Sequence, residues 1–203
     1  TALIGESGSG KSLTLKAILN LLSSSLDVKK NIISDFELSF DTIGFIPQNP
    51  FTSLSSMTKI KNQIFCSDEK KEEVFKLLDL PLEILEKYPS QISGGQTQRV
   101  VIAIALSRDI KLLLLDEPTT ALDFENKTNI INIINDLKDN LNINILFVTH
   151  DIESIKDICD DIVIIKNGYV VEFGETQEVL NKPQNEYTKK LLNSSFKNKK
   201  FRN

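Results

Sequence analysis

Eight residues near the start of the chain form its strongest chemical pattern. They read GESGSGKS and fit G-x-x-x-x-G-K-[ST] at every required position. In this pattern the glycines let backbone N–H groups turn toward a polyphosphate, the Lys11 ammonium reaches its outer oxygens, and the Ser12 hydroxyl ligates magnesium. The sequence therefore predicts a site for nucleotide phosphate. The predicted contacts are Gly5, Glu6, Ser7, Gly8, Ser9, Gly10, Lys11 and Ser12.

The segments on either side of this loop support the prediction. Residues 1–4 are mostly apolar, as expected of a short strand, and residues 11–22 have a helical pattern. The amino end of a helix adds a partial positive charge that favours an anion. The alternative is a Gly/Ser-rich connector that fits the pattern by accident. A strand before the loop and a helix after it favour the phosphate site.

A pair of carboxylates provides the second candidate site. Asp116 and Glu117 end the apolar run LLLL, which has the composition of a buried strand. In an open α/β sheet, ligands bind at the carboxyl ends of the strands. We expect Asp116 to hold magnesium and Glu117 to act as the base that orients an attacking water. The alternative is a solvated acidic strand end, which is less favoured because the chain also contains a phosphate loop.

A second helix start has the features of an anion site. Ser93 in the stretch ISGGQ precedes the apolar run 100–106, so we expect it to be the N-cap of a buried helix. Ser93 lies in a helical insertion and Lys11 in the core, so one nucleotide cannot easily occupy both sites of one chain. The simplest solution is that this second helix end serves a nucleotide held by another subunit.

The elements that must position these residues follow an α/β pattern. Short Ile-, Leu- and Val-rich runs at 43–46, 111–115, 143–148 and 161–165 predict strands buried on both faces, in a mostly parallel sheet. Between two of them, apolar residues from Ile130 to Leu141 recur at helical spacing and predict an amphipathic crossover helix.

The chain is expected to fold as a single domain, 1–203, with an inserted part. Residues 51–107 show helical patterns and no strand signal, which predicts an α-helical subdomain. The core then comprises about 1–50 and 108–192. The polar, lysine-rich end, 193–203, predicts a frayed tail, with contact to anionic lipid headgroups as the less favoured alternative.

Composition excludes several classes of protein. The 203 residues are 40% hydrophobic and 26% charged, which is ordinary for a globular chain. A net charge of -4 argues against a general nucleic-acid binder, which needs a basic surface. Cys66 and Cys159 lack metal-ligand spacing, so we expect free thiols. No apolar run approaches the roughly twenty residues of a membrane span.

The stretch ISGGQ, following the phosphate loop, resembles the LSGGQ signature of ABC transporter ATP-binding subunits. The resemblance implies a P-loop NTPase (RecA-like) core with an inserted helical subdomain, and it implies ATP and Mg²⁺ as ligands. Isoleucine replaces leucine at the first signature position, an apolar exchange that leaves the phosphate-facing groups unchanged.

Three further motifs follow in the order of that family. Gln48, in IPQNP, resembles the Q-loop glutamine, which in the family touches magnesium and the water. Asp123, in TALD, resembles the D-loop aspartate, which links the two nucleotide sites of a dimer. His150 follows an apolar strand and resembles the switch histidine at the γ-phosphate. A polar loop glutamine and an ordinary histidine are the plainer alternatives.

The resemblance also assigns ligand sets and partners. Glu117, His150 and Gln48 would be catalytic, and Ser12, Gln48 and Asp116 would hold Mg²⁺. The nucleotide of a second subunit would be contacted by Ser93, Gly94, Gly95, Gln96 and Asp123. The expected partners are a second ATPase subunit, identical or related, two transmembrane permease subunits and, indirectly, a solute-binding protein, with no nucleic acid. The chain would sit peripherally on the cytoplasmic face of the inner or plasma membrane.

Finer features are similar to the peptide and nickel importer ATPases of the family. They are FTSL after Gln48, YPSQ before the signature, and Pro183 with EYTKKLL at 186–192. The stretch 26–40 is short, the helical insertion is abbreviated near Cys66, and a cysteine-rich C-terminal extension is absent. Because Thr1 lies so close to the phosphate loop, we expect the opening strands and the adenine-stacking aromatic residue of the family to be missing from a truncated amino end.

Two other functions compete with the importer ATPase. A soluble ABC ATPase that acts on DNA or ribosomes would carry long, coiled or basic insertions, and none is present. A catalytically silent binding subunit would have lost part of its chemistry, and the presence of both Glu117 and His150 argues against it.

Overall fold

The computed structural model of the chain describes residues 1–120 and 122–197, which form two compact units. The first unit comprises Thr1–Ile33 and Ile145–Asn203, and the second comprises Ser34–Asn144. This division differs from the expected one, because the strands near 43–46 and 112–116 group with the helical insertion rather than with the phosphate loop.

A sheet organises the first unit, with its strands in the order β4-β1-β5-β6. The strands are β1 (Ala2–Ile4), β4 (Asn144–Thr149), β5 (Asp161–Lys166) and β6 (Tyr169–Glu175). β1 runs parallel to β4 and to β5, and Leu3 lies opposite Val148 on one side and Val163 on the other. β1 is buried along its whole length, as an apolar central strand should be.

β6 pairs antiparallel with β5 through a two-residue turn. Asn167 and Gly168 both have positive φ, 50° and 82°, which is the requirement of the tight turn that matches strand twist. The residues KNG thus supply the turn of a β-hairpin. It also brings Gly168 to the phosphate loop.

Helix α1 (Lys11–Ile18) follows the phosphate loop and is shorter than the predicted 11–22. The chain leaves the helix at Asn20, which adopts φ 58°. The N–H of Leu21 donates to the carbonyl oxygen of Lys16 at 2.8 Å, and the N–H of Asn20 donates to that of Ala17. This Schellman arrangement satisfies the last carbonyls, so an asparagine stops a helix whose apolar pattern continues.

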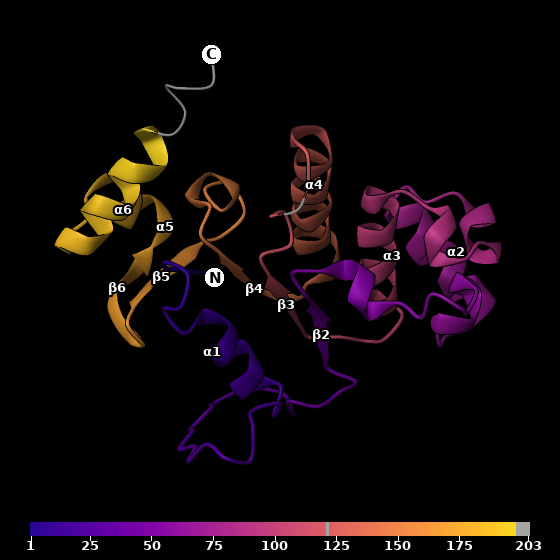
Figure 1. Cartoon of the computed structure of the whole chain (residues 1–203), viewed down its shortest axis with the longest axis horizontal. Helices are drawn as coiled ribbons and strands as arrows, with labels where there is room; N and C mark the ends of the chain where they lie inside the picture. Colours follow the sequence, from indigo (N-terminus) through magenta and orange to yellow (C-terminus); the bar gives the residue numbers. More distant parts are fainter. Residues whose placement is uncertain (121, 198–203) are drawn as a thin grey trace. The chain divides into compact units, whose positions relative to one another are not determined.

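The end of the first unit is more helical than expected. After the short η5 (Ile152–Ser154) and the β5–β6 hairpin come α5 (Thr176–Asn181) and α6 (Glu186–Lys197) (Figure 1). α6 buries Tyr187, Leu191 and Leu192. The first five residues of the predicted tail, 193–197, therefore belong to a helix, and the remainder of that tail lies outside the described residues.

The second unit is built on two parallel strands and a long helix. β2 (Ile43–Ile46) pairs with β3 (Leu112–Asp116), with Ile43 opposite Leu112 and Ile46 opposite Leu115. α4 (Phe124–Leu141) follows β3. Its residues Ile130, Ile134 and Leu137 are buried at helical spacing, as the sequence predicts.

The segment between β2 and β3 contains helices and no strand, in agreement with the prediction for residues 51–107. Its elements are η1 (Pro50–Ser53), η2 (Ile60–Gln63), α2 (Asp68–Leu77), η3 (Leu82–Glu86), η4 (Pro89–Gln91) and α3 (Gly94–Leu106). α3 is the centre of this segment, because it packs on β2, on η1 and on α2 (Figure 1). The contact of α3 with β2 explains why the strands and the insertion form one unit.

Neither Cys66 nor Cys159 takes part in a disulfide bond, and Cys159 is buried. The expectation of two separate thiols is therefore confirmed. Within residues 1–120 and 122–197, no helix has the length and apolar character needed to cross a membrane.

Candidate nucleotide site

The phosphate loop leaves the carboxyl end of β1 and enters α1 at Lys11. Its glycines are required at particular points. A Cβ on Gly5 would lie 2.4 Å from the carbonyl oxygen of Ile165, so no larger residue fits there. Gly8 and Gly10 adopt φ 81° and 108°, which side chains disfavour. The loop therefore follows a path that its glycines permit and most other residues would not.

Lys11 is buried inside this loop. Its Nζ donates to the carbonyl oxygens of Gly5, at 2.8 Å, and of Glu6, at 3.0 Å. The side chain folds back over the loop, and two of its three N–H groups are engaged. A full positive charge is thus held where the loop's backbone turns.

The loop has the properties of an anion site. The buried hydroxyl of Ser9 has no hydrogen-bond partner among the residues that the structure describes. Gly10 caps α1 without a side-chain hydrogen bond, so the first-turn N–H groups of the helix receive no cap from that residue. An orphan hydroxyl, a helix amino end and a lysine ammonium fit a polyphosphate.

His150 leaves the sheet at the same edge as the phosphate loop. It is the first residue after β4, and Thr149 lies opposite Ile4, which immediately precedes Gly5. His150 is exposed, and the neighbouring Asp151 carboxylate caps η5 by accepting from the N–H of Glu153. The expectation that His150 stands at a strand's carboxyl end is confirmed.

In the second unit, Glu117 is held in a defined orientation directly after β3. It adopts φ 48°, an uncommon value outside glycine. Its Oε2 accepts from the Thr120 hydroxyl at 2.9 Å and lies 3.4 Å from Nε2 of Gln48. The structure therefore brings together two of the predicted catalytic residues, Gln48 and Glu117, and adds Thr120.

The predicted magnesium ligands have suitable chemistry. Ser12, Gln48 and Asp116 offer hydroxyl, amide and carboxylate oxygens, which magnesium prefers. The amide nitrogen of Gln48 faces Glu117, so its Oε1 is the atom that can ligate a cation. Ser12 lies in the first unit and the other two in the second.

The signature stretch begins α3 with a reciprocal cap. The N–H of Gln96 donates to the Ser93 hydroxyl at 3.2 Å, and the N–H of Ser93 donates to Oε1 of Gln96 at 3.0 Å. The prediction that Ser93 is an N-cap is confirmed. The capping box satisfies two N–H groups at the helix start, and it fixes the Ser93 side chain.

Asp123 begins α4 in a similar way and is tied to the signature through one residue. Its carboxylate accepts from the backbone N–H of Asn126 at 2.9 Å and from Nδ2 of Asn126 at 2.8 Å. These bonds hold the pKa of Asp123 below its ordinary value. Oδ1 of Asn126 approaches Gly95 so closely that a Cβ there would lie 2.4 Å from it. The starts of α3 and α4 therefore meet at Asn126.

The sequence did not reveal three of these contacts. Thr120 orients Glu117, Asn126 joins Asp123 to Gly95, and Tyr187 binds the phosphate loop through a hydrogen bond to Glu6. Thr120 stands three residues after Glu117, and Asn126 stands three residues after Asp123, so these two pairs have a local signal. The contacts of Asn126 with Gly95 and of Tyr187 with Glu6 depend on tertiary packing.

A buried parallel strand that leads through a phosphate loop into a helix, with acidic residues ending another parallel strand, defines the class of P-loop nucleoside triphosphatases. The ABC transporter family model matches residues 1–120 of the chain. The chain belongs to this family, as its signature indicated.

Two relatives of known name indicate which ABC ATPases the chain is similar to. The chain is 31% identical to the oligopeptide transport ATP-binding protein OppD of Lactococcus lactis subsp. cremoris (strain SK11), over 96% of this chain and 65% of that protein. It is 34% identical to the metal-staphylopine import system ATP-binding protein CntD of Staphylococcus aureus (strain Mu50 / ATCC 700699), over 96% of this chain and 81% of that protein. The prediction of an ABC ATPase that is similar to those of the peptide importer subfamily is confirmed.

A solved structure supports the fold. The ATP-binding cassette MJ0796, a dimer in a post-hydrolysis state bound to ADP and Pi, superposes with a TM-score of 0.69 at 29% identity. The match covers 86% of this chain and 84% of that one. The predicted P-loop NTPase fold is confirmed. The chain spans 65% of the length of the OppD relative named above.

Proposed function

We propose that the chain binds ATP with magnesium, hydrolyses the ATP, and thereby drives an ABC importer as its nucleotide-binding subunit. The observation that carries the proposal is the buried Lys11 ammonium, held by the carbonyls of Gly5 and Glu6 beside the orphan hydroxyl of Ser9. In a loop of this shape, a charged lysine ordinarily binds phosphate.

Each residue of the proposed site has one task. Lys11 and the loop N–H groups neutralise and orient the phosphates. Ser12, Gln48 and Asp116 would hold the magnesium, which would offset the negative charge of the phosphates. Glu117, oriented by Thr120, accepts a proton from the attacking water. His150 stabilises the charge on the transferred phosphoryl group.

The signature residues act on a second nucleotide. Ser93, Gly94, Gly95 and Gln96 would contact the ATP of a partner ATPase subunit, and Asp123 would link the two sites. The dimeric cassette MJ0796 with ADP and Pi supports this arrangement. Two chains, identical or related, would close on two ATP molecules and reopen after hydrolysis.

Membrane permease subunits are the proposed recipients of this motion. The names of the relatives support an importer for oligopeptides or for a metal complex. Phe51, three residues after Gln48, is exposed and offers an apolar contact for a permease near the catalytic glutamine. We place the chain peripherally on the cytoplasmic face of the membrane, with a solute-binding protein as an indirect partner.

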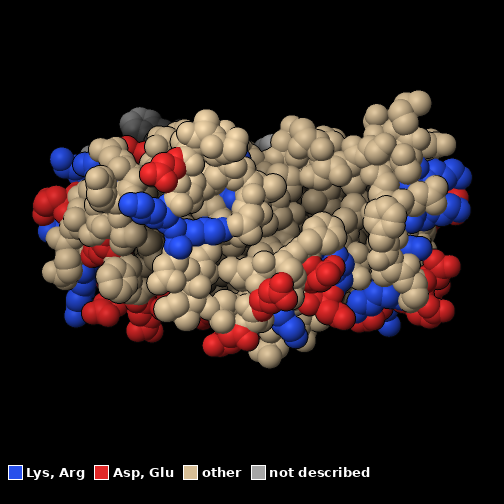
Figure 2. All heavy atoms as spheres, turned by 90° about the horizontal axis from the view of Figure 1, so that it is seen from below, with Lys and Arg blue, Asp and Glu red and all other residues tan. Residues whose placement is uncertain are grey.

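A soluble ATPase that acts on DNA or ribosomes is not favoured. Figure 2 shows acidic side chains next to basic ones along the lower edge of the face presented. The net charge of -4 also disfavours phosphate-backbone binding.

Glu117→Gln tests the catalytic assignment. The variant keeps the size of the side chain and removes the base, so we expect turnover to fall at least about 100-fold while ATP binding is retained. Glu125→Gln, an exposed residue of the α4 first turn, is the matched control and should leave turnover unchanged. Unchanged turnover in Glu117→Gln would eliminate Glu117 as the base. Absence of ATP binding by the unaltered chain would refute the function itself.

The importer assignment needs a separate measurement. We expect the protein, purified from the membrane fraction in mild detergent, to retain two permease subunits that mass spectrometry can identify. Recovery with ribosomes or with nucleic acid instead would contradict the importer.

A further inference from the structure

A tyrosine from the far end of the chain contacts the phosphate loop. The backbone N–H of Glu6 donates to the hydroxyl oxygen of Tyr187 at 3.2 Å, across 181 residues of sequence. Tyr187 lies on α6 and is only 8% exposed. We propose that Tyr187 is a positioning residue that holds the phosphate loop in its nucleotide-binding shape; this inference rests on the proposed ATP site.

The contact acts on the peptide unit that also holds the lysine. The N–H of Glu6 and the carbonyl of Gly5 belong to one planar peptide group and point in opposite directions. Tyr187 binds the N–H end, and Nζ of Lys11 binds the carbonyl end at 2.8 Å. Rotation of this peptide would break both hydrogen bonds. Tyr187 therefore fixes the carbonyl that positions the Lys11 ammonium.

The tyrosine is itself held in place. Nζ of Lys166, at the end of β5, lies 4.8 Å from the centre of the Tyr187 ring, a cation–π contact. The backbone N–H of Tyr187 donates to Oδ1 of Asn185 at 2.8 Å. Asn185 lies immediately before α6. The ring thus has a contact on its face and an anchor at its backbone.

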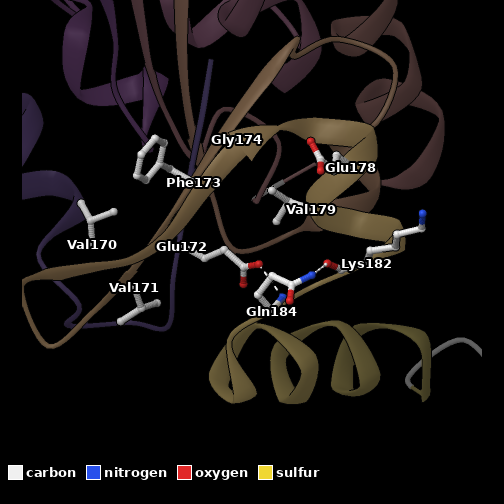
Figure 3. A pocket seen from close by; sticks show the side chains of 9 residues that line it. All are labelled: Val170, Val171, Glu172, Phe173, Gly174, Glu178, Val179, Lys182 and Gln184. Carbon is white, nitrogen blue, oxygen red and sulfur yellow. Dashed lines mark hydrogen bonds between the residues drawn. The ribbon is translucent and has the colours of Figure 1, made fainter.

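The start of α6 is clamped to β6 by a carboxylate. Glu172 accepts from the backbone N–H groups of Gln184, at 2.6 Å, and Asn185, at 3.1 Å. Figure 3 shows Glu172 reaching from the strand toward Gln184, at one side of a cavity of about 500 Å³ between β6 and α5. Nδ2 of Asn185 also donates to the carbonyl of Val171.

The charge of Glu172 belongs to this clamp. Partial burial is the largest single influence on the Glu172 pKa and opposes ionisation. The backbone N–H groups of Gln184 and Asn185 and the charge of Lys189 oppose that effect, and the pKa lies below its ordinary value. The contacts of Glu172 with the start of α6 therefore favour its ionised form.

The same hairpin holds the loop at a second point. The N–H of Gly168, in the β5–β6 turn, donates to the carbonyl of Ser9 at 2.9 Å. The hairpin and the helix clamped to it thus bind the loop on both sides of Gly8. Because the loop contacts phosphates that ATP and ADP share, loosening one of these points should weaken binding of both nucleotides and leave the chemical step largely unchanged.

Tyr187→Phe tests the proposal because it removes the hydroxyl and keeps the ring. Loss of one neutral hydrogen bond predicts about two- to tenfold weaker binding of ATP and of ADP, measured by titration calorimetry, with kcat changed much less than KM. Tyr169→Phe is the matched control, since Tyr169 is an exposed tyrosine on β6 whose hydroxyl makes no hydrogen bond to another described residue. It should bind both nucleotides as the unaltered chain does.

Amide hydrogen exchange without nucleotide gives a readout that does not depend on ATP. Tyr187→Phe should speed exchange at Glu6 and leave Gly168 protected. Unchanged exchange at Glu6, or faster exchange with unchanged nucleotide affinity, would overturn the proposal. If the unaltered chain bound no nucleotide, the proposed function would fail while the Glu6 exchange rate still decided the contact. If Tyr187→Phe does not fold, Glu172→Gln loosens the same helix and is judged by both readouts.

Discussion

Two adjacent glycines of the signature stretch should respond oppositely to alanine. A Cβ on Gly95 would lie 2.4 Å from Oδ1 of Asn126, whereas a Cβ on Gly94 would lie 3.7 Å from the ring of Phe51, an ordinary contact. Both residues open α3. Alanine replaces glycine in a helix with a gain of about 0.5–1 kcal/mol when space allows. Gly94→Ala should therefore be neutral or stabilising.

Gly95→Ala has to displace the asparagine. Ordinary van der Waals contact begins at 3.4 Å, so Oδ1 of Asn126 must move by about 1 Å from the 2.4 Å at which it would meet the new Cβ. That amide is tied to the Asp123 carboxylate by its Nδ2, so it cannot shift without straining that bond. Overpacking of this kind costs about 1–3 kcal/mol. We expect Gly95→Ala to be less stable than Gly94→Ala by about that amount.

Urea denaturation of each single variant and of each in an Asn126→Ala background measures the difference. Removing the asparagine side chain should abolish the penalty, so that Gly95→Ala becomes as stable as Gly94→Ala. Equal stability of the two single variants would refute the packing argument. So would a penalty that persists after Asn126 is shortened, because the clash would then have another source.

Two further predictions concern titratable groups. Burial, the largest influence, raises the pKa of Cys66 above its ordinary value. Alkylation of Cys66 should therefore be slower at pH 8 than that of a free cysteine and should accelerate as the pH rises, and a faster reaction at pH 8 would contradict this. The buried Cys159 should react only on unfolding. The lowered pKa of Glu172 implies stability that is present above the ordinary value near 4.5 and is lost as the pH falls through the folded-state pKa. Thermal unfolding at pH 7 and at pH 3.5 should show a smaller acid-induced loss in Glu172→Gln than in the unaltered chain, and equal losses would show that the clamp of Gln184 and Asn185 does not depend on charge.

Motifs with fixed spacing could be predicted from the sequence, because each is local chemistry. The phosphate loop, the strand that ends at Asp116 and the Ser93 cap each require particular residues within a few positions, and the structure has them in those places. Apolar runs likewise predicted the strands, since buried parallel strands need no polar face.

Errors arose where a neighbour in space decided the outcome. α1 ends at Ile18 although apolar residues continue, because the left-handed turn at Asn20 satisfies the last carbonyls of the helix. Residues 193–197 extend α6, although Asn193 and Ser194 have weak helix propensity, because the preceding turns pack through Leu191 and Leu192. Contacts such as that of Tyr187 with Glu6 join distant segments, and no local sequence pattern predicts them.

Because Lys11 is hydrogen-bonded inside the loop, the loss of its hydration shell and the binding of an anion are separate steps, whereas a surface lysine would undergo both at once. The ammonium leaves water when the chain folds, because loop carbonyls take the place of its hydration shell. In the proposed ATP site, an arriving phosphate would therefore meet a cation that is already largely dehydrated and oriented, and few solvent molecules would have to be reorganised on binding. A buried charge lowers the free energy of unfolding of the protein when no anion is bound to it.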